Sequence, residues 1–313
     1  MNSLDFWIKI KSSIIENRKI ALAIVFDADN STPGRKGFKM FVTQEDIICG
    51  SVGGGLIEAM VIQECKNLLL NPKSNYFKEY KLLGNAKDSI GMICNGVQII
   101  GFVIVDEKYL SIIDNIITSI ESNKAGSIII TCEKFDFKPD KVKDSKFNKE
   151  HFKYVETTGI KNRVYIFGGG HVGLAVSKIL AMLEFYVLII DNRKDVSTLV
   201  SNKYANEIII KDFVEAVSDI IEDENSYIVI VTPGHMQDKE VLKAVLDMKV
   251  KYIGMMGSES KVRTIYKELV SDGINEDALS RIHSPIGVKI RSETPEEIAI
   301  SIAAEIIGIK NTK

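Results

Sequence analysis

From Arg163 onward, short apolar runs typical of β-strands alternate with stretches that have the periodicity of helices. The apolar runs are residues 164–167, 186–191, 207–212, 227–232 and 252–256. This alternation is typical of parallel strands whose connecting helices cover both faces of a sheet. We therefore expect an α/β protein in which residues 161–313 form a Rossmann-like domain with a doubly wound parallel sheet.

Helix boundaries in this region carry their own signals. Thr294 is the expected N-cap of the last helix, Pro295 its first residue, and Glu297 completes a capping box. Gly308 is expected to follow the end of this helix. A further helix is expected to include residues 213–221, between the third and fourth apolar runs.

The first half of the chain lacks the regular alternation. Residues 4–17 have helical periodicity, whereas residues 21–26, 38–43 and 46–52 are typical of strands. We expect a smaller N-terminal α+β domain over residues 1–132. The stretch 133–153 holds seven lysines and five acidic residues, which predicts a solvated linker over residues 133–160.

The first candidate binding motif lies between the first apolar run of the C-terminal half and its helix. Gly168, Gly170 and Gly173 fit the G-x-G-x-x-G pattern of dinucleotide-binding folds, and Asp191 lies 23 residues after Gly168. We expect the glycines to admit a pyrophosphate and Asp191 to accept hydrogen bonds from a ribose. Arg193 would favour a phosphate there instead, so NAD and NADP stay open. The alternative is a tight turn that binds no nucleotide.

Polar residues also follow the first, fourth and fifth apolar runs. His171 follows the first and His235 the fourth, whereas Ser258 follows the fifth. If the strand order is 3-2-1-4-5, the first and fourth strands are neighbours at the point where ligands bind such sheets. The two histidines could then bind a metal or transfer protons. Alternatively, His235 is a helix cap or a solvated loop residue, and Ser258 is only an N-cap.

A second glycine-rich turn lies in the N-terminal half. Gly53, Gly54 and Gly55 lead directly into a helical pattern, and such a junction suits an anion. Arg35 and Lys39, from the preceding loop, could supply cationic partners. The alternative is a tight turn from strand to helix.

Four cysteines complete the candidates. Cys94 precedes a turn-forming Asn-Gly pair, and its thiolate would be a soft metal ligand or a sulfur acceptor. A buried, inert cysteine is the alternative. Cys49, Cys65 and Cys132 lie in apolar runs and are expected in the core. No two cysteines have Cys-x-x-Cys spacing, so the strong signature of structural zinc is missing.

Composition excludes some functions. Lys and Arg total 40 and Asp and Glu total 42, so the basic excess of a general nucleic-acid binder is missing. No uncharged apolar run approaches the ~20 residues of a membrane span, and the first residues do not resemble a signal peptide. We expect a cytoplasmic protein without disulfides and without nucleic-acid or membrane partners.

Taken together, these motifs resemble the XdhC/CoxI family, accessory proteins of molybdenum hydroxylases of the xanthine dehydrogenase type. In the N-terminal half the resemblance covers STPGRKGFKM, GSVGGGLIEA and GMICNG. In the C-terminal half it covers RVYIFGGGHVG, IIDNR, TPGHMQD, YIGMMGSESK, HSPIG and TPEEIAISIAAEII. Residues 133–160 carry no resemblance.

The resemblance implies an N-terminal XdhC/CoxI-type domain, a Rossmann-like C-terminal domain and a role in maturing molybdenum cofactor. Family members are thought to bind this molybdopterin, which is often extended by a nucleotide, assist its sulfuration and deliver it to an apo-molybdenum hydroxylase. The resemblance makes Cys94 the leading candidate for contact with the metal or its sulfur. It also favours a maturation chaperone over a free-standing enzyme, with a cysteine desulfurase as a further partner. We also expect a homo-oligomer, because two modest domains rich in apolar residues leave room for an interface.

Two other functions remain open. The chain could be an NAD(P)-dependent oxidoreductase that uses residues 168–191 as its cofactor site and His235 as acid or base. It could instead be a Rossmann-like scaffold that binds a protein partner and no small molecule.

Overall fold

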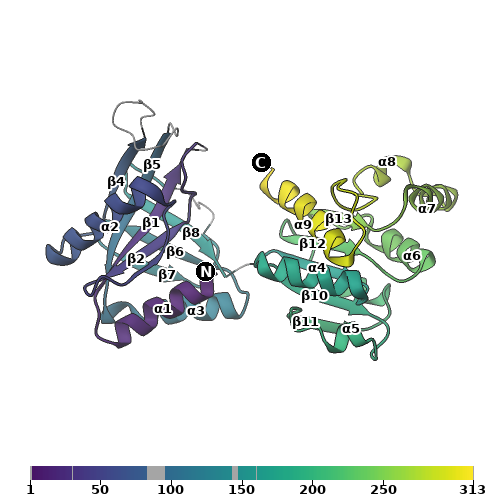
Figure 1. Cartoon of the computed structure of the whole chain (residues 1–313), viewed down its shortest axis with the longest axis horizontal. Helices are drawn as coiled ribbons and strands as arrows, with labels where there is room; N and C mark the ends of the chain where they lie inside the picture. Colours follow the sequence, from purple (N-terminus) through teal and green to yellow (C-terminus); the bar gives the residue numbers. More distant parts are fainter. Residues whose placement is uncertain (1, 30, 83–95, 143–146, 160, 313) are drawn as a thin grey trace. The chain divides into compact units, whose positions relative to one another are not determined.

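The computed structural model describes residues 2–29, 31–82, 96–142, 147–159 and 161–312. The chain divides into two compact units, Met1–Ile160 and Lys161–Lys313. We call them the N-terminal unit and the C-terminal unit (Figure 1). The boundary coincides with the expected start of the C-terminal domain. Among the described residues, no helix is both long enough and apolar enough to cross a membrane.

The N-terminal unit is built around an antiparallel sheet with the order β3-β2-β1-β5-β4. Two helices precede and interrupt these strands. The elements are α1 (Ser3–Ile15), β1 (Ile20–Ala28), β2 (Lys39–Thr43), β3 (Ile48–Gly50), α2 (Gly55–Leu70), β4 (Tyr76–Leu82) and β5 (Gly96–Val105). Alternate residues of β1 point to opposite faces. Ala21, Ala23 and Val25 pack with residues of α2, whereas Leu22 and Ile24 pack with residues of α1.

A second, three-stranded sheet completes this unit, with the order β7-β6-β8. Its elements follow β5 in the chain as η1 (Glu107–Tyr109), α3 (Leu110–Glu121), β6 (Gly126–Thr131), β7 (Phe135–Lys138) and β8 (Lys153–Thr158). Ile128 and Ile130 of β6 join α1 and α3 in one core cluster.

The prediction of a linker over residues 133–160 is wrong. This stretch contains β7 and β8, which both pair antiparallel with β6. Phe135 and Tyr154 are 1% and 0% exposed within the core. The charged residues that suggested a linker are mostly exposed or partly exposed. In an edge strand only alternate residues need to be apolar, so a high charge content did not exclude pairing.

The C-terminal unit is a parallel sheet with the order β11-β10-β9-β12-β13. This is the order 3-2-1-4-5 that the sequence analysis considered, and the Rossmann-like prediction is confirmed. The elements are β9 (Arg163–Phe167), α4 (His171–Met182), β10 (Tyr186–Asp191), α5 (Ser197–Val200), β11 (Glu207–Ile210), η2 (Glu215–Asp219), β12 (Ser226–Ile230), α6 (His235–Val245), β13 (Tyr252–Met255), α7 (Glu259–Ser271), α8 (Glu276–Leu279) and α9 (Pro295–Asn311).

Helices cover both faces of this sheet (Figure 1). Val164 and Ile166 of β9 pack with residues of α4 and α9, whereas Tyr165 and Phe167 pack with residues of α6 and α7. The burial of every second residue on each face explains why these strands are almost continuously apolar in sequence.

Two helix predictions need correction. Only the 3₁₀ turn η2 forms where a helix was expected over residues 213–221. The last helix begins at its Thr294 cap with the predicted capping box, but it passes through Gly308 and ends at Asn311. Ile309, beyond the glycine, still packs against the core, and this contact favours continuation over termination at Gly308.

Candidate functional site

The strand order reverses between β9 and β12, and both strands are followed by helices at their carboxyl ends. α4 begins after Gly170 and α6 begins after Gly234, and no side chain of the described residues caps either start. His171 and His235 are the first residues of these helices, and both are exposed. The structure therefore brings two helix N-termini without a side-chain cap and two imidazoles to one edge of the sheet. The shared edge of the two histidines is the arrangement that the order 3-2-1-4-5 implied.

The glycines of this turn have different tasks. Gly168 has φ +114°, and a Cβ there would lie 2.4 Å from the carbonyl oxygen of Val231. A Cβ on Gly173 would lie 2.0 Å from the carbonyl oxygen of Gly168. Both positions are thus closed by backbone. A Cβ on Gly170 would meet no atom of the described residues within 4 Å, so the backbone there faces open space in this part of the structure.

Asp191 does not have the free carboxylate that a ribose contact needs. Its side chain is 0% exposed and accepts from the backbone N–H of Gly169 at 2.8 Å and of Arg193 at 3.0 Å. The Arg193 guanidinium donates to both carboxylate oxygens, at 2.9 and 2.8 Å. Burial opposes ionisation of Asp191, but these donors outweigh it and hold its pKa below the ordinary value.

Asp191 and Arg193 therefore shape the glycine turn. Gly169 donates its N–H to Asp191, and its carbonyl oxygen accepts from the buried hydroxyl of Thr198. Both backbone groups of Gly169 are thus held by side chains of β10 and α5, which fixes the turn before any ligand arrives. The prediction that Asp191 or Arg193 selects the nucleotide is not supported by these contacts.

A buried ion pair lies beside this edge. Asp238 in the first turn of α6 is 0% exposed and accepts from Lys261 Nζ at 2.5 Å. Thr232 donates its hydroxyl to Asp238 at 2.5 Å and its N–H at 3.2 Å. Burial raises the pKa of Asp238, although Lys261 and Thr232 act in the opposite direction. The sequence gave no signal of this pairing.

Ser258 is the N-cap of α7. Its side chain accepts from the N–H of Lys261 at 3.3 Å and lies 3.0 Å from the hydroxyl of Ser260. This is the capping role that the sequence left open for it. Among the described residues, no group of three or more His, Cys, Asp or Glu side chains is arranged to hold a metal ion.

The glycine turn of the N-terminal unit differs from that of the C-terminal unit. Gly53, Gly54 and Gly55 all have positive φ, and Gly54 is the N-cap of α2. The Glu58 carboxylate accepts from the N–H of Gly54 at 3.2 Å and from the Ser51 hydroxyl at 2.5 Å. The chain thus places its own anion at this helix start, which argues against the predicted anion site.

The two predicted cationic partners are also engaged. Lys39 donates to Glu156 at 2.5 Å and to the carbonyl oxygen of Gly37 at 2.8 Å. Arg35 donates to the carbonyl oxygens of Thr32 and Gly34 in its own loop. The hydrogen-bond partners of both side chains thus lie outside residues 53–55.

Three of the sequence motifs do meet in this unit. A Cβ on Gly53 would lie 2.4 Å from the backbone N of Gly34, and one on Gly96 would lie 2.6 Å from Ser31 Oγ. Gln98, which the sequence did not single out, lies against Gly34 with 0% exposure. Its Nε2 donates to the carbonyl oxygen of Val52 at 2.7 Å. The sequence signal that could have identified Gln98 is its amide side chain within the otherwise apolar run of β5.

Cys94, the predicted metal or sulfur contact, lies outside the described residues. Cys65 is buried as expected, and burial raises the pKa of its thiol to about 12. Cys49 is partly buried and packs against the core cluster of α1 and β1, whereas Cys132 is exposed, so the core prediction is wrong for Cys132. Cys132 belongs to the same apolar run as β6 but lies one residue beyond the end of that strand at Thr131.

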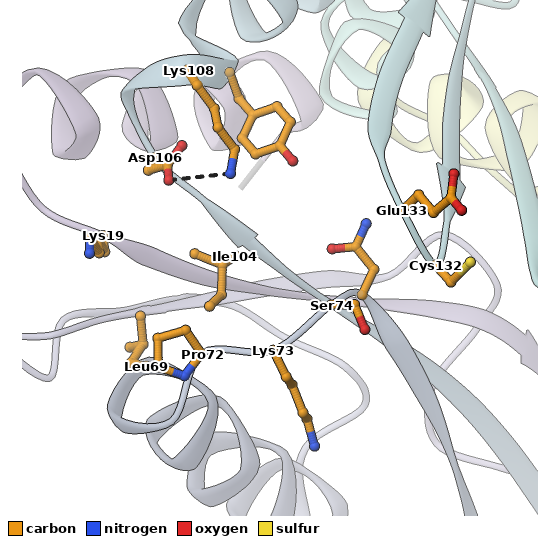
Figure 2. A pocket seen from close by; sticks show the side chains of 12 residues that line it. Lys19, Leu69, Pro72, Lys73, Ser74, Ile104, Asp106, Lys108, Cys132 and Glu133 are labelled. Atoms are coloured by element: carbon orange, nitrogen blue, oxygen red, sulfur yellow. Dashed lines mark ion pairs between the residues drawn. The ribbon is translucent and has the colours of Figure 1, made fainter.

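Cys132 lines a cavity of about 470 Å³ in the N-terminal unit. Figure 2 shows Ile104, Leu69 and Pro72 on one side and Cys132 with Glu133 on the other. Lys108 points toward Asp106, with the ion-pair atoms 3.6 Å apart. None of the predicted site residues that the structure describes lines this cavity.

Comparison with known proteins covers both units. Residues 164–306 match the family model of the XdhC Rossmann domain, and residues 14–80 match that of the XdhC and CoxI family. The uncharacterized protein YqeB of Escherichia coli (strain K12) is 25% identical over 297 residues. That match spans 95% of this chain but only 44% of the relative's length.

Two further relatives match over nearly their whole length. A probable xanthine dehydrogenase subunit of Bacillus subtilis (strain 168) is 23% identical over 327 residues, 97% of each chain. The crystal structure of a xanthine dehydrogenase from Bacillus halodurans superposes with a TM-score of 0.77 at 19% identity. It covers 99% of this chain and 96% of that chain, and it supports the fold.

Proposed function

Because this chain belongs to the XdhC and CoxI family, we propose that it is an accessory protein in the maturation of a xanthine dehydrogenase-type molybdenum hydroxylase. In this proposal it binds molybdenum cofactor, assists its sulfuration and delivers it to the apo-hydroxylase. A cysteine desulfurase is the proposed sulfur donor. Support comes from the Bacillus subtilis relative, which is named as a probable xanthine dehydrogenase subunit and matches 97% of this chain.

The observation that carries the proposal is the pair of open helix N-termini at the carboxyl edge of the C-terminal sheet. α4 and α6 start at glycines, without a side-chain cap from the described part of the chain. The free N–H groups and the partial positive charge of a helix start suit phosphate oxygens. Molybdopterin and its nucleotide-extended forms carry phosphate, so their phosphates fit this edge.

The fit differs at the N-terminal turn. Glu58 already accepts the N–H of Gly54, so a phosphate there would meet a carboxylate. We therefore assign phosphate binding to the edge with Gly170 and Gly234. Cys94 is the proposed soft contact for the metal or its sulfur. The bound cofactor supplies the redox chemistry of the client hydroxylase, whereas this chain binds and orients it.

His171 and His235 are the proposed side-chain contacts at this edge. Each is the first residue of a helix whose start is open, and each is exposed. A neutral imidazole can donate and accept a hydrogen bond at once, and a protonated one adds positive charge. We propose that the two rings orient the phosphate and the adjacent heterocycle.

The experiment is purification from a host that makes molybdenum cofactor, followed by identification of bound pterin or dinucleotide by mass spectrometry. Gly170→Glu and Gly234→Glu each place a carboxylate at a helix start, and we expect the retained pterin to fall at least about tenfold. Met182→Glu is the matched control, because Met182 is 72% exposed at the other end of α4. A wild-type protein that retains no pterin contradicts the proposal.

The role of Cys94 is tested separately. We expect Cys94→Ala to leave client xanthine dehydrogenase largely unactivated in a maturation assay, and Cys65→Ala, at a buried thiol, to serve as the control cysteine variant. Equal activation by wild type and Cys94→Ala would remove Cys94 from the mechanism.

The nicotinamide alternative lacks the contact that suggested it. Asp191 already accepts four hydrogen bonds within the chain, two from backbone N–H groups and two from the Arg193 guanidinium. A titration with NAD(H) and NADP(H) that shows no binding would exclude this alternative.

A further inference from the structure

The two edge strands of the C-terminal sheet differ in whether another segment pairs with them. At β13, the segment that contains His283 and Ile286 hydrogen-bonds to the edge. His283 donates its N–H to Ile253 and accepts from Met255, and Ile286 donates to Met255. At the opposite edge lies β11, which pairs only with β10 among the described strands. Figure 1 shows β11 at the margin of this sheet, next to α5.

The exposed edge is apolar. β11 has the sequence EIII, and Ile208 and Ile210 are 41% and 47% exposed. Ile208 lies beside Ile189 in the parallel register, so both isoleucines face the same side of the sheet as the cluster around α4. Val200, at the end of α5, is 79% exposed. Edge strands are usually protected by charge, as Lys78, Glu79 and Lys81 protect β4.

The backbone of β11 also has N–H and C=O groups at this edge that pair with no other strand among the described residues. Lys211 donates its N–H inward to the carbonyl oxygen of Asp191 at 3.1 Å. Alternate residues of a strand direct their N–H and C=O groups to opposite sides, so Ile209 also faces β10. The N–H and C=O groups of Ile208 and Ile210 therefore point outward.

From this geometry we propose that β11 pairs antiparallel with β11 of a second copy of this chain. A two-fold axis at Ile209 places Ile208 of one copy opposite Ile210 of the other. These residues have the outward backbone groups, so each such pair exchanges two hydrogen bonds. The same register places Glu207 opposite Lys211 of the second copy, and this gives opposite charges at both ends of the pair.

The pairing joins two five-stranded sheets into one continuous sheet. It also gathers the exposed isoleucines of both copies on one face. β11 is only four residues long, so the strand pair alone is smaller than the interface of a permanent dimer. We expect a monomer–dimer equilibrium that depends on concentration.

Sedimentation of the full chain between about 1 µM and about 1 mM measures this equilibrium. Ile210→Pro removes an outward N–H without touching the bonds to β10, and we expect it to raise the dissociation constant at least about tenfold. Ile300→Lys, at a position of α9 that is 51% exposed, is the control and should leave the dissociation constant unchanged.

A charge swap tests the register and does not depend on proline. Glu207→Lys and Lys211→Glu each place like charges opposite one another, and each is expected to weaken the dimer. The double variant Glu207→Lys/Lys211→Glu restores opposite charges across the axis and is expected to recover association. Within the chain, Tyr186 contacts Glu207 and Asp219 contacts Lys211. Tyr186 and Asp219 are not substituted in any of these variants.

Either of two results would overturn the proposal. One is a wild-type chain that stays monomeric over the whole concentration range. The other is a dimer whose dissociation constant is unaffected by Ile210→Pro and by both single charge variants, since association would then use another surface. Circular dichroism of each variant identifies any loss of folding, and the charge swap remains decisive if Ile210→Pro does not fold.

Discussion

At the residue scale, Asp191 shows how a carboxylate at the carboxyl edge of the sheet can be occupied by hydrogen bonds from the chain itself. An acid near the end of the second strand is the expected ribose contact in a Rossmann-like sheet. Here Arg193 lies two residues later and forms a bidentate pair with it. The pattern of the motif is present, but the side-chain geometry assigns the acid to holding the glycine turn.

Asp191→Asn is expected to lower the free energy of unfolding by about 1–3 kcal/mol at pH 7. The substitution removes the buried negative charge that accepts hydrogen bonds from Gly169 and Arg193. The folded pKa of Asp191 lies below its ordinary value. Its stabilisation is therefore present above about pH 4, the unfolded pKa, and is lost as pH falls through the folded pKa. The difference in Tm between wild type and Asp191→Asn should shrink below about pH 4. A difference that grows there would contradict this account.

The control for this measurement is Asp195→Asn. Asp195 is exposed and lies in the same loop, so its substitution should change Tm little at either pH. Thermal unfolding followed by circular dichroism at pH 7 and near pH 3.5 compares the two variants.

The cysteines separate by exposure and not by sequence context. Cys132 is exposed, whereas Cys65 is buried with a thiol pKa raised to about 12 by that burial. In a Cys94→Ser background, we expect a maleimide to label Cys132 at pH 7.5 at least about tenfold faster than Cys65. Mass spectrometry of peptides gives both rates. Cys132→Ala serves as the control, and equal labelling of the two thiols would show that the N-terminal core opens.

At the element scale, the glycine turn before α4 joins close packing to an open helix start. Gly173 allows α4 to approach the turn after β9 backbone to backbone, and Gly168 allows the same turn to approach the backbone of Val231 after β12. Gly170 leaves the helix start accessible. The sequence marked all three glycines as one motif. Only the structure shows that two of them serve packing and one faces open space.

Gly173→Ala should be strongly destabilising, because its Cβ would lie 2.0 Å from the carbonyl oxygen of Gly168. We expect a loss of about 2 kcal/mol or more in urea unfolding, since the crowded atom is backbone and cannot rotate away. Gly170→Ala is the matched control. Its Cβ meets nothing within 4 Å, so the loss should stay below about 1 kcal/mol. Equal losses for the two variants would refute this division of roles.

At the scale of the whole molecule, each unit has its own buried clusters. Ile24 belongs to a cluster of the N-terminal unit, and Ile166 belongs to one of the C-terminal unit; both are 0% exposed. Because each unit encloses a core, each is expected to unfold as a cooperative domain.

Calorimetry tests this expectation. Ile24→Ala and Ile166→Ala each remove a buried side chain, at an expected cost of about 2–5 kcal/mol to the unit concerned. Each variant should lower the midpoint temperature of one unfolding transition and leave that of the other near its wild-type value. Ile15→Ala, at a position 60% exposed on α1, is the control. A single transition that both variants lower equally would show that the units unfold together.

Local patterns accounted for most of the architecture. Parallel strands, the helices between them, the Thr294 capping box and the glycine turns follow from periodicity, capping and backbone freedom, which neighbouring residues fix among themselves. The order 3-2-1-4-5 also matched, because short right-handed connections leave few alternatives. The two neighbouring helix starts with His171 and His235 were predicted for the same reason.

Tertiary structure decided what depends on residues far apart in the chain. β7 and β8 form because β6 offers both of its edges to them, although their sequence is highly charged. Three groups that the sequence left available for a ligand have partners within the chain. Glu58 accepts from the N–H of Gly54, Arg193 donates to Asp191, and Glu156 accepts from Lys39. Cys132 is exposed because β6 ends just before it. Such contacts gain their energy from partners brought together only by folding, so no local pattern records them.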